Sequence, residues 1–392
     1  MVVVIYIIGA AILIFAGLME KRTIRKSIEK IEIRVNVNGI RGKSTATRFI
    51  TAILQEAGYR VVGKTTGTSA RMIFWNKEEE ETIKRRPIGP NIGEQTRVLK
   101  RVADMGVDAL VCECMAVNPE YQDVYQNQII QANIVVITNV VEDHLDEMGP
   151  TTEQIAWAFA KTIPERGILV ITEGPYADYF KKVAKKKHTK VVCVDPSWVD
   201  EEYTRQFPYM VFQNNCAIGA GFAYAMGIDM KLAVQAMLKA HPDPGAAQIV
   251  KVNRNNRKCW LVNAFAANEP TSSLEIWKNI QNYGFPLENQ IVLLNCRDDR
   301  VDRSKQFAQD FLPNIKVKTL IVIGSGTLGI LNSFRKNEFP DIEECIDMTK
   351  RKSDELIAEV EQLMENNIIF CVGNIHGQEA EEFLENIAGI AI

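Results

Sequence analysis

The sequence predicts an α/β fold of two domains, each built on a largely parallel β-sheet. Short apolar runs rich in β-branched residues alternate with segments of helical spacing, which is the pattern of strand–helix–strand units. Ile31 to Val37 is the first predicted strand, and Thr45 to Ala57 is the helix after it. The alternation stops at His241-Pro242-Asp243-Pro244-Gly245 and then begins again, so this segment predicts a domain boundary.

Composition limits the classes of protein to which the chain can belong. It has 392 residues, of which 46% are hydrophobic, enough for two or three domains with sizeable cores. The formal net charge of −3 argues against nucleic acid as the main partner. Eight scattered cysteines show no zinc-site spacing, so we interpret them as reduced, mostly buried thiols of a cytosolic compartment.

A glycine turn joins the first predicted strand to the first predicted helix. Backbone N–H groups and the positive end of a helix meet at such a turn and bind anions. Lys43 can reach the β- and γ-phosphates of a nucleotide, and a hydroxyl at the helix start can bind Mg²⁺. The strict phosphate-loop pattern has a glycine where this chain has Val37, so a basic tight turn is the alternative interpretation. The predicted nucleotide contacts are Gly39, Arg41, Gly42, Lys43, Ser44 and Thr45.

The amino-terminal run Val2 to Leu18 is apolar and uncharged, and a basic stretch follows it at 21–26. A helix of this length would be roughly 26 Å long, just short of a ~30 Å hydrocarbon core. We therefore predict a single-pass membrane anchor at 1–20, with the rest of the chain in the cytoplasm because of the basic flank. A buried amino-terminal helix is the alternative.

Carboxylates and a histidine follow two further predicted strands. The strand 107–112 ends at Glu113, and the strand 133–138 leads into T-N-V-V-E-D-H-L-D at 138–146. Ligands bind at the carboxyl ends of the strands in doubly wound sheets. Glu113 and His144, with Asp143 and Asp146 beside the histidine, therefore predict a Mg²⁺ site beside the phosphate loop. For His144 alone, a surface-loop histidine is the alternative.

The other segments complete the predicted order of elements. Tyr59 to Thr66 predicts a strand, the charged run 77–86 a solvated loop, and 87–94 an irregular turn-rich segment. We place the first α/β domain at 31–245 and a second, Rossmann-like domain at 246–392. The remaining predicted strands are 167–172, 190–195, 259–262, 291–295, 319–323 and 368–372, and the remaining helices are 215–226, 230–240, 271–283, 304–311 and 379–387.

Several motifs together resemble those of the Mur ligases and folylpolyglutamate synthases. They are the phosphate loop, Glu113, the segment 138–146, Asn215 before a small-residue helix, and the linker Pro244-Gly245. The resemblance covers about residues 32–380 and implies a central ATP-binding domain with a smaller carboxyl-terminal domain. It implies that Lys43 binds the β- and γ-phosphates and that Asn215 lies near the adenine. It also implies that Glu113 and His144 hold a second Mg²⁺.

The sequence departs from that family's pattern at several points. An arginine that many Mur ligases carry after the linker glycine is Ala246 here, and an aspartate near the ribose or phosphate is replaced by Asn263. The nucleotide-sugar domain of Mur ligases has no counterpart, so we do not expect a UDP-muramoyl substrate. Many members carry a carbamylated lysine, which we cannot assign here; the nearby lysines are Lys181, Lys182 and Lys185.

Longer motifs resemble the family of poly-γ-glutamate synthase B subunits, the capsule ligases of bacilli. They include V-G-K-T-T-G-T, G-P-N-I-G-E-Q, C-E-C-M-A-V-N-P, E-D-H-L-D-E-M-G-P, N-C-R-D-D-R-V-D-R and V-G-N-I-H-G. This resemblance implies an ATP- and Mg²⁺-dependent ligase that polymerises glutamate through a γ-glutamyl phosphate. It implies membrane-protein companions in a synthase complex and leaves a homo-oligomer open.

Carboxylate substrates require cationic partners, and arginine binds carboxylates through paired hydrogen bonds. Arg297, Arg300 and Arg303 follow a predicted strand of the second domain, and we expect them to bind glutamate or the growing chain. A solvated loop that begins a helix is their alternative. Asn268 and His376 are further candidates on the substrate side. The rival hypothesis is a membrane-tethered ATPase that energises polymer synthesis or export without ligating.

Overall fold

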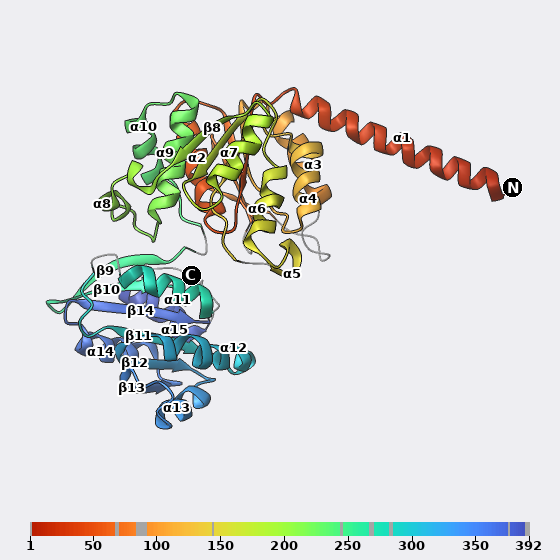
Figure 1. Cartoon of the computed structure of the whole chain (residues 1–392). Coiled ribbons are helices and arrows are strands. Elements are labelled where there is room, and N and C mark those ends of the chain that lie inside the picture. The colour runs from red at the N-terminus through yellow and green to blue at the C-terminus, as the bar shows by residue number, and fades with distance from the viewer. Residues whose placement is uncertain are drawn as a thin grey trace. The chain divides into compact units, whose positions relative to one another are not determined.

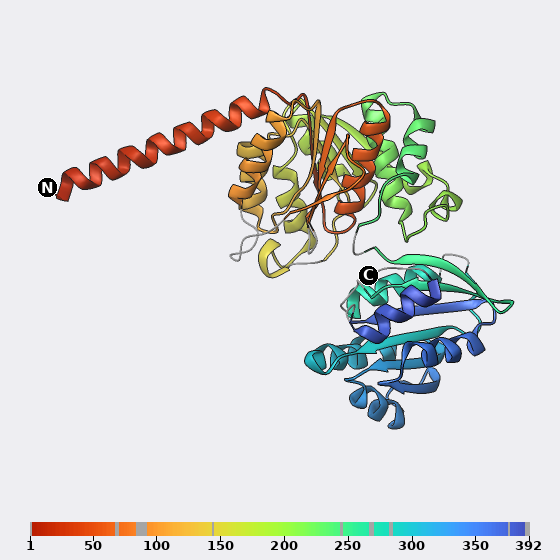
Figure 2. The same cartoon turned by 180° about the vertical axis from the view of Figure 1, so that it is seen from behind.

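The computed structural model describes residues 2–66, 70–83, 92–142, 145–243, 246–265, 270–281, 285–374 and 377–388. The chain divides into two compact units, coloured red to green and green to blue in Figure 1 and seen from behind in Figure 2. Unit 1 comprises Met1–Thr204 and Val211–Asp243, and unit 2 comprises Arg205–Met210 and Pro244–Ile392.

The short segment 205–210 belongs to unit 2, which the sequence did not predict. Its backbone pairs with the chain that follows the linker. Met210 N donates to Ala247 O at 2.8 Å, and Tyr209 forms an antiparallel bridge with Gln248. The chain therefore passes between the units three times rather than once.

Unit 1 is built around an eight-stranded sheet of order β4-β3-β2-β5-β1-β6-β7-β8. The strands from β2 to β8 in that order are parallel, while β3 and β4 are antiparallel at one edge. Strand β1, which leads into the phosphate loop, is therefore central. The strands are β1 (Ile33–Asn38), β2 (Val61–Lys64), β3 (Arg71–Phe74), β4 (Glu81–Thr82), β5 (Ala109–Glu113), β6 (Ile134–Ile137), β7 (Ile168–Thr172) and β8 (Lys190–Val194).

Helices cover both faces of this sheet. In Figures 1 and 2, α2, α9 and α10 lie on one side, and α3, α4 and α6 lie on the other. The larger helices are α1 (Val2–Ile28), α2 (Lys43–Glu56), α3 (Ile92–Asp104), α4 (Pro119–Val124), α6 (Thr152–Lys161), α7 (Ala177–Lys186), α9 (Gln213–Met226) and α10 (Met230–Leu238). The shorter ones are the π-helical turn η1 (Tyr125–Ile130), α5 (Leu145–Met148), η2 (Pro196–Trp198) and α8 (Glu201–Thr204).

Small residues allow helix α9 to pack closely on the sheet, as its sequence indicates. A Cβ atom at Gly221 would lie 2.3 Å from Val194 Cγ1, and one at Gly219 would lie 2.4 Å from Met237 Sδ. A side chain at Gly221 would therefore push the helix away from strand β8, and one at Gly219 would require the Met237 side chain to move.

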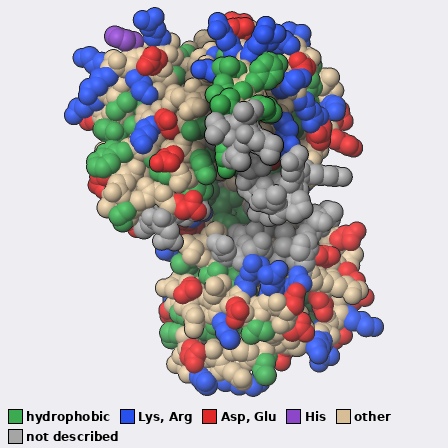
Figure 3. Space-filling model, turned by 90° about the vertical axis from the view of Figure 1, so that its right-hand side faces the viewer, with side chains coloured by type: hydrophobic (Ala, Val, Ile, Leu, Met, Phe, Trp, Pro, Cys, Tyr) green, Lys and Arg blue, Asp and Glu red, His purple; other side chains and the backbone are tan. Residues whose placement is uncertain are grey.

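Helix α1 projects from unit 1, and its carboxyl-terminal part packs beside α3. Its apolar side chains are exposed; Tyr6 and Leu13 are each 74% exposed. Figure 3 views the side of the molecule from which α1 projects, and it shows hydrophobic side chains beside Lys and Arg side chains on that side. No helix in the described part of the chain is long and apolar enough to cross a membrane. The predicted membrane-spanning helix is therefore not supported.

Unit 2 is a second α/β unit with a six-stranded sheet of order β13-β12-β11-β14-β10-β9. All neighbouring strands are parallel except β9, which is antiparallel to β10. The strands are β9 (Gln248–Arg254), β10 (Arg257–Asn263), β11 (Ile291–Cys296), β12 (Val317–Gly324), β13 (Ile342–Thr349) and β14 (Asn367–Gly373). The helices are α11 (Pro270–Gln281), η3 (Asp298–Arg300), α12 (Val301–Gln306), η4 (Phe307–Phe311), η5 (Leu312–Asn314), α13 (Leu328–Arg335), α14 (Ser353–Leu363) and α15 (Gln378–Ala388).

The structure contains elements that the sequence analysis did not predict. Strands β3, β4, β9 and β13 and helices α3 to α8, α13 and α14 were not among the predicted elements. The segment 87–94 was expected to be irregular, but its last residues begin helix α3 at Ile92. Similarly, the short strand β4 lies within the charged run that was expected to be only a loop. Strand β4 has two residues, too few to show a periodic pattern. Helices α3, α7 and α14 do have an apolar face at helical spacing, which went unrecognised.

Candidate active site

The phosphate loop has the backbone that an anion site requires. Gly39 and Gly42 have φ angles of +123° and +78°, which side chains other than hydrogen rarely allow. A Cβ atom at Gly39 would lie 2.1 Å from Thr138 Oγ1, and one at Gly42 would lie 2.3 Å from Asn215 Oδ1. Both glycines are therefore needed for backbone shape and for close packing. Asn215, predicted at the adenine, lies buried against the loop at the start of α9.

Two side chains of the segment after strand β6 hold the loop from the neighbouring strand. Arg41 N donates to Asn139 Oδ1 at 3.0 Å. The Arg41 carbonyl oxygen accepts from Thr138 Oγ1 at 2.7 Å and from Asn139 Nδ2 at 3.0 Å. The threonine and asparagine of the predicted motif therefore position the phosphate loop, a role that the sequence analysis did not assign to them.

The Lys43 side chain folds back onto the phosphate loop. Its Nζ donates to Gly39 O at 3.0 Å and to Ile40 O at 2.9 Å. Carbonyl oxygens are weaker partners for an ammonium group than phosphate oxygens are. The ammonium group is therefore already in the loop and can exchange these carbonyls for a bound phosphate.

Glu113 and Ser44 meet beside the loop, as their positions after a strand and at a helix start predict. Glu113 is buried at the end of β5, and its Oε2 accepts from Ser44 Oγ at 2.9 Å and from Thr66 N at 2.8 Å. Thr45 follows on α2 and is partly buried. A carboxylate and a hydroxyl at hydrogen-bond distance form an all-oxygen pair of the kind that Mg²⁺ prefers.

Several predicted site residues lie outside the described residues: Asp143, His144, Asn268 and His376. Asp146 belongs to the short helix α5. No group of three or more His, Cys, Asp or Glu side chains in the described ranges is placed to hold a metal ion. The metal site with Glu113 and His144 therefore remains a prediction.

A buried ion pair that was not predicted from the sequence links the phosphate-loop helix α2 to the end of unit 1. Arg48 on α2 is 3% exposed and forms paired hydrogen bonds with Glu80. Its Nε lies 3.5 Å from Asp243 Oδ1. Burial raises the pKa of the Asp243 carboxyl group, and the Arg48 charge opposes that rise. An arginine within an amphipathic helix gives no sequence signal of burial, because its partners are 32 and 195 residues away.

The three predicted substrate arginines of unit 2 differ in their surroundings. Arg297 pairs with Asp299, with Nε–Oδ1 and Nη2–Oδ2 distances of 2.8 and 2.6 Å. Arg300 is exposed, and Arg303 Nη1 donates to Asn374 Oδ1 at 3.2 Å. Asn374 is buried just after β14, so Arg303 reaches the carboxyl end of the sheet. Asn374 belongs to the glycine loop 373–377 that was predicted on the substrate side with His376, but its contact with Arg303 was not predicted.

Close backbone contact shapes this edge of the second sheet. Gly373 at the end of β14 has a φ of +104°, and a Cβ atom there would lie 2.4 Å from Asn295 O. Asn295 Nδ2 donates to Asn374 O at 2.8 Å. Asn263, predicted at ATP, ends β10 of unit 2, and its Oδ1 accepts from Phe265 N at 3.3 Å. These residues lie at the carboxyl ends of the neighbouring parallel strands β10, β14 and β11, which is the usual ligand position in such sheets.

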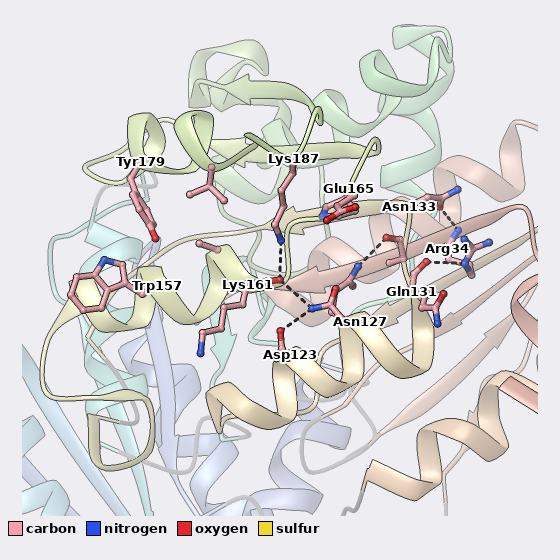
Figure 4. Close-up of a pocket in the computed structure, with 15 residues that line it drawn as sticks. Arg34, Asp123, Asn127, Gln131, Asn133, Trp157, Lys161, Glu165, Tyr179 and Lys187 are labelled. Atoms are coloured by element: carbon pink, nitrogen blue, oxygen red, sulfur yellow. Dashed lines mark hydrogen bonds between the residues drawn. The ribbon is translucent and has the colours of Figure 1, made fainter. Parts of the chain in front are cut away.

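A separate pocket of about 880 Å³ lies at the opposite end of the unit 1 sheet (Figure 4). It lies before the strands β6, β7 and β8, and it contains none of the predicted site residues. Lys187 Nζ donates to Ile163 O at 2.6 Å, and Asn127 Nδ2 donates to Asp123 Oδ1 at 2.8 Å. Burial lowers the pKa of Lys187. These polar groups of the pocket are thus used in hydrogen bonds within the protein. We therefore do not place the active site in this pocket.

Comparison with known families agrees with this division of the chain. Residues 37–212 match the model of the Mur ligase middle domain. Residues 249–389 match the model of the poly-gamma-glutamate synthase CapB C-terminal domain.

Two curated proteins are similar along nearly the whole chain. The capsule biosynthesis protein CapB of Bacillus anthracis is 49% identical over 385 residues, which are 98% of this chain and 82% of that protein. The PGA synthase CapB of Bacillus subtilis (strain 168) is 48% identical over 381 residues, which are 97% of this chain and 96% of that protein.

Solved structures share the fold at low sequence identity. The E. coli FolC complex with ADP has a TM-score of 0.61 at 13% identity and covers 94% of this chain and 92% of its own. A bifunctional folylpolyglutamate synthase/dihydrofolate synthase with Mn, AMPPNP and L-glutamate bound has a TM-score of 0.57 at 12% identity. That alignment covers 94% of this chain and 92% of its own. At these identities the likeness supports the fold alone.

The contact between Gly42 and Asn215 predicts the effect of one added methyl group. Gly42→Ala strains the backbone and pushes against the asparagine, so we expect ATP affinity to fall roughly tenfold, for about 1–2 kcal/mol of strain. Titration with a fluorescent ATP analogue measures this. Gly58→Ala is the matched control, because Gly58 has a φ of +90° with no atom near its Cβ position. Wild-type affinity in Gly42→Ala would contradict the close-packing argument.

Proposed function

The chain belongs to the CapB family of poly-γ-glutamate synthases, and we propose that it is itself an ATP-dependent ligase that polymerises glutamate. One observation carries the proposal: a phosphate loop with a Ser44–Glu113 pair stands at the carboxyl edge of a Mur-ligase-like sheet. The hypothesis of an ATPase that does not ligate is not favoured, because unit 2 matches the carboxyl-terminal domain of the synthases.

The residues present fit ATP and a divalent cation. The two glycines give the phosphate loop a backbone that no Cβ atom obstructs, and the Lys43 ammonium group lies within it. Ser44 Oγ and the Glu113 carboxylate would hold the cation, which we propose to be Mg²⁺, with His144 as a further ligand. When bound, the cation would neutralise phosphate charge and polarise the γ-phosphoryl group.

The chemistry follows from the substrates of such a ligase. A carboxylate does not accept an amine at neutral pH unless one of its oxygens becomes a good leaving group. In the proposed reaction the γ-carboxylate oxygen of one glutamate bonds to the γ-phosphorus of ATP, and ADP leaves. The amino nitrogen of a second glutamate then bonds to the carbonyl carbon, phosphate leaves, and the amine proton passes to solvent. Lys43 opposes the negative charge of the transferred group, and the loop N–H groups orient it.

We propose that the arginines of unit 2 bind the carboxylates of glutamate or of the growing chain. Arg303 is the strongest of the three candidates, because its contact with Asn374 holds it at the carboxyl edge of the sheet. Arg297 already has a carboxylate partner in Asp299, which a substrate carboxylate would have to replace. Arg300 is exposed and available to a long anionic polymer. Asn268 and His376 remain proposed substrate contacts, as Asn263 remains a proposed ATP contact.

We also propose that helix α1 attaches the chain to the cytoplasmic face of the cell membrane. Its exposed apolar side chains and the basic residues that follow them support this proposal. The acyl region of a membrane favours apolar side chains, and anionic headgroups attract basic ones. ATP is a cytoplasmic substrate, which favours the same side of the membrane. Membrane-protein companions of a synthase complex, and a homo-oligomer, remain proposals that rest on the family.

The proposed reaction predicts that a strong nucleophile can trap the activated carboxylate. With ATP, a divalent cation and glutamate, hydroxylamine should yield a hydroxamate, and the nucleotide product should be ADP. Lys43→Ala should lower hydroxamate formation by roughly 100-fold or more, which is the usual loss for one charge-stabilising donor. Colorimetric assay of the hydroxamate and chromatography of the nucleotides measure both. Release of AMP and pyrophosphate would instead mean adenylation.

The position of Arg303 predicts a selective loss. Arg303→Met removes a charge-assisted contact of about 1.5–3 kcal/mol, so the KM for glutamate should rise roughly 10- to 100-fold while the KM for ATP changes little. Arg300→Ala should likewise raise the KM for glutamate far more than the KM for ATP. Arg351→Met is the control, because Arg351 lies on the same unit and its pair with Glu355 is exposed. An equal rise in both KM values would indicate a structural role.

The exposed face of α1 predicts membrane binding. Leu13→Asp places a charge among the apolar side chains and should move most of the protein from the membrane fraction to the supernatant after ultracentrifugation. Leu328→Asp, at an apolar residue exposed to a similar extent on unit 2, should leave the distribution unchanged. Protease added to intact cells should leave the two units undigested. Digestion there, or unchanged sedimentation of Leu13→Asp, would contradict the proposed attachment.

A further inference from the structure

Lys64, the last residue of strand β2, is a buried lysine that the proposed mechanism does not use. It is only 1% exposed. An ammonium group removed from water is costly unless a charged partner compensates it, so lysines are almost never fully buried without one. Lys64 lies at the carboxyl edge of the sheet, beside Cys112 of β5 in the register of the two strands. A buried charge at the ligand edge of a sheet requires a physical explanation.

The partner of Lys64 is Glu94 in the first turn of α3. Lys64 Nζ lies 3.7 Å from Glu94 Oε1, and the Glu94 side chain is 19% exposed. A carboxylate in the first turn of a helix is also favoured by the partial positive charge of the helix end. The pair therefore connects the carboxyl end of β2 to the amino end of α3, at the edge of the sheet where strand β1 leads into the phosphate loop.

The chain that leaves Lys64 makes a direct contact with the predicted metal ligand. Thr65 is fully buried, and its backbone N–H donates to Arg71 O at 2.9 Å. The next residue, Thr66, donates its N–H to Glu113 Oε2 at 2.8 Å. Ser44 Oγ donates to the same oxygen. Both donors bind Oε2, so together they orient the carboxylate and leave Oε1 as the oxygen that can take a cation.

We propose that the Lys64–Glu94 pair is a positioning device for Glu113. The buried ion pair holds the end of β2 in place, the end of β2 holds the Thr66 N–H, and the Thr66 N–H holds the carboxylate in its cation-binding orientation. Lys64 and Glu94 are thus positioning residues, two steps removed from the cation. This inference rests on the proposed function as far as the cation is concerned, but the link from Lys64 to Thr66 does not.

The test compares Lys64→Met with the wild-type chain by two readouts that do not depend on catalysis. Methionine keeps the length of the side chain without its charge, and the partly exposed Glu94 can then be hydrated. Hydrogen exchange at the Thr66 amide, measured by NMR without metal or nucleotide, should become roughly tenfold faster. The Mn²⁺ concentration that half-saturates the protein with AMPPNP, measured by electron paramagnetic resonance, should rise roughly tenfold, as is usual when an outer partner of a metal ligand is lost.

Matched variants separate positioning from general damage. Metal-free ADP binding should stay within about twofold of wild type, because Lys43 and the loop N–H groups are untouched. Lys100→Met, on helix α3 with Glu94, removes an exposed pair with Asp104 and should change neither readout. The double variant Lys64→Met/Glu94→Gln should be no worse than Lys64→Met. If Lys64→Met does not fold, Glu94→Gln provides the same comparison, with the same expected changes.

The outcomes distinguish this inference from the proposed function. Unchanged Thr66 exchange and an unchanged Mn²⁺ requirement in a folded Lys64→Met variant would overturn the inference alone. An equal loss of metal-free ADP binding would also overturn it, since the pair would then support the whole edge of the sheet. If wild-type protein binds no Mn²⁺ with AMPPNP, the proposed function fails. Faster Thr66 exchange in Lys64→Met would still support the structural link in that case.

Discussion

The structure depends on one constraint at the end of strand β1: the phosphate loop must keep some peptide N–H groups for an anion while others hold its shape. Peptide groups committed to an anion cannot also stabilise their own turn. Neighbouring strands and helices supply the missing contacts instead. Thr138 and Asn139 bind the Arg41 peptide groups, and Asn215 packs against Gly42. The elements β6 and α9 are thus tied to the loop by polar side chains at the edge of the sheet.

Charge burial at the same edge follows from this arrangement. Glu113, Lys64 and Arg48 are all nearly inaccessible to solvent, and each has a charged or hydrogen-bonding partner from a distant part of the chain. Buried charges of this kind contribute little net stability, because removing them from water costs about as much as pairing returns. Their value lies in orientation. A carboxylate held by two donors presents a defined oxygen, and an arginine with two carboxylate partners joins the phosphate-loop helix to the last residues of unit 1.

Prediction succeeded where a local pattern carries the information and failed where the partner is remote. The strand–turn–helix unit at 31–57 can be predicted because the hydrophobic periodicity, the glycines and the lysine all lie within one short stretch of sequence. The proximity of Ser44 and Glu113 follows from a general rule, since parallel strands end at a common edge. No rule of spacing pairs Lys64 with Glu94, or Arg303 with Asn374. Likewise, nothing in 205–210 predicts that these residues belong with the chain beyond the linker.

The sequence by itself determined the two α/β units, the positions of most strands along the chain, and the phosphate loop as an anion-binding turn. These properties depend on periodicity and on residues close together in the chain, which local physics controls. Only the tertiary structure decided which peptide groups hold the loop, which Glu113 oxygen accepts the two hydrogen bonds, and which arginine reaches the edge of the second sheet. Those outcomes depend on distances of a few ångströms between residues far apart in sequence. Burial and side-chain direction, which set those distances, arise only when the layers pack together.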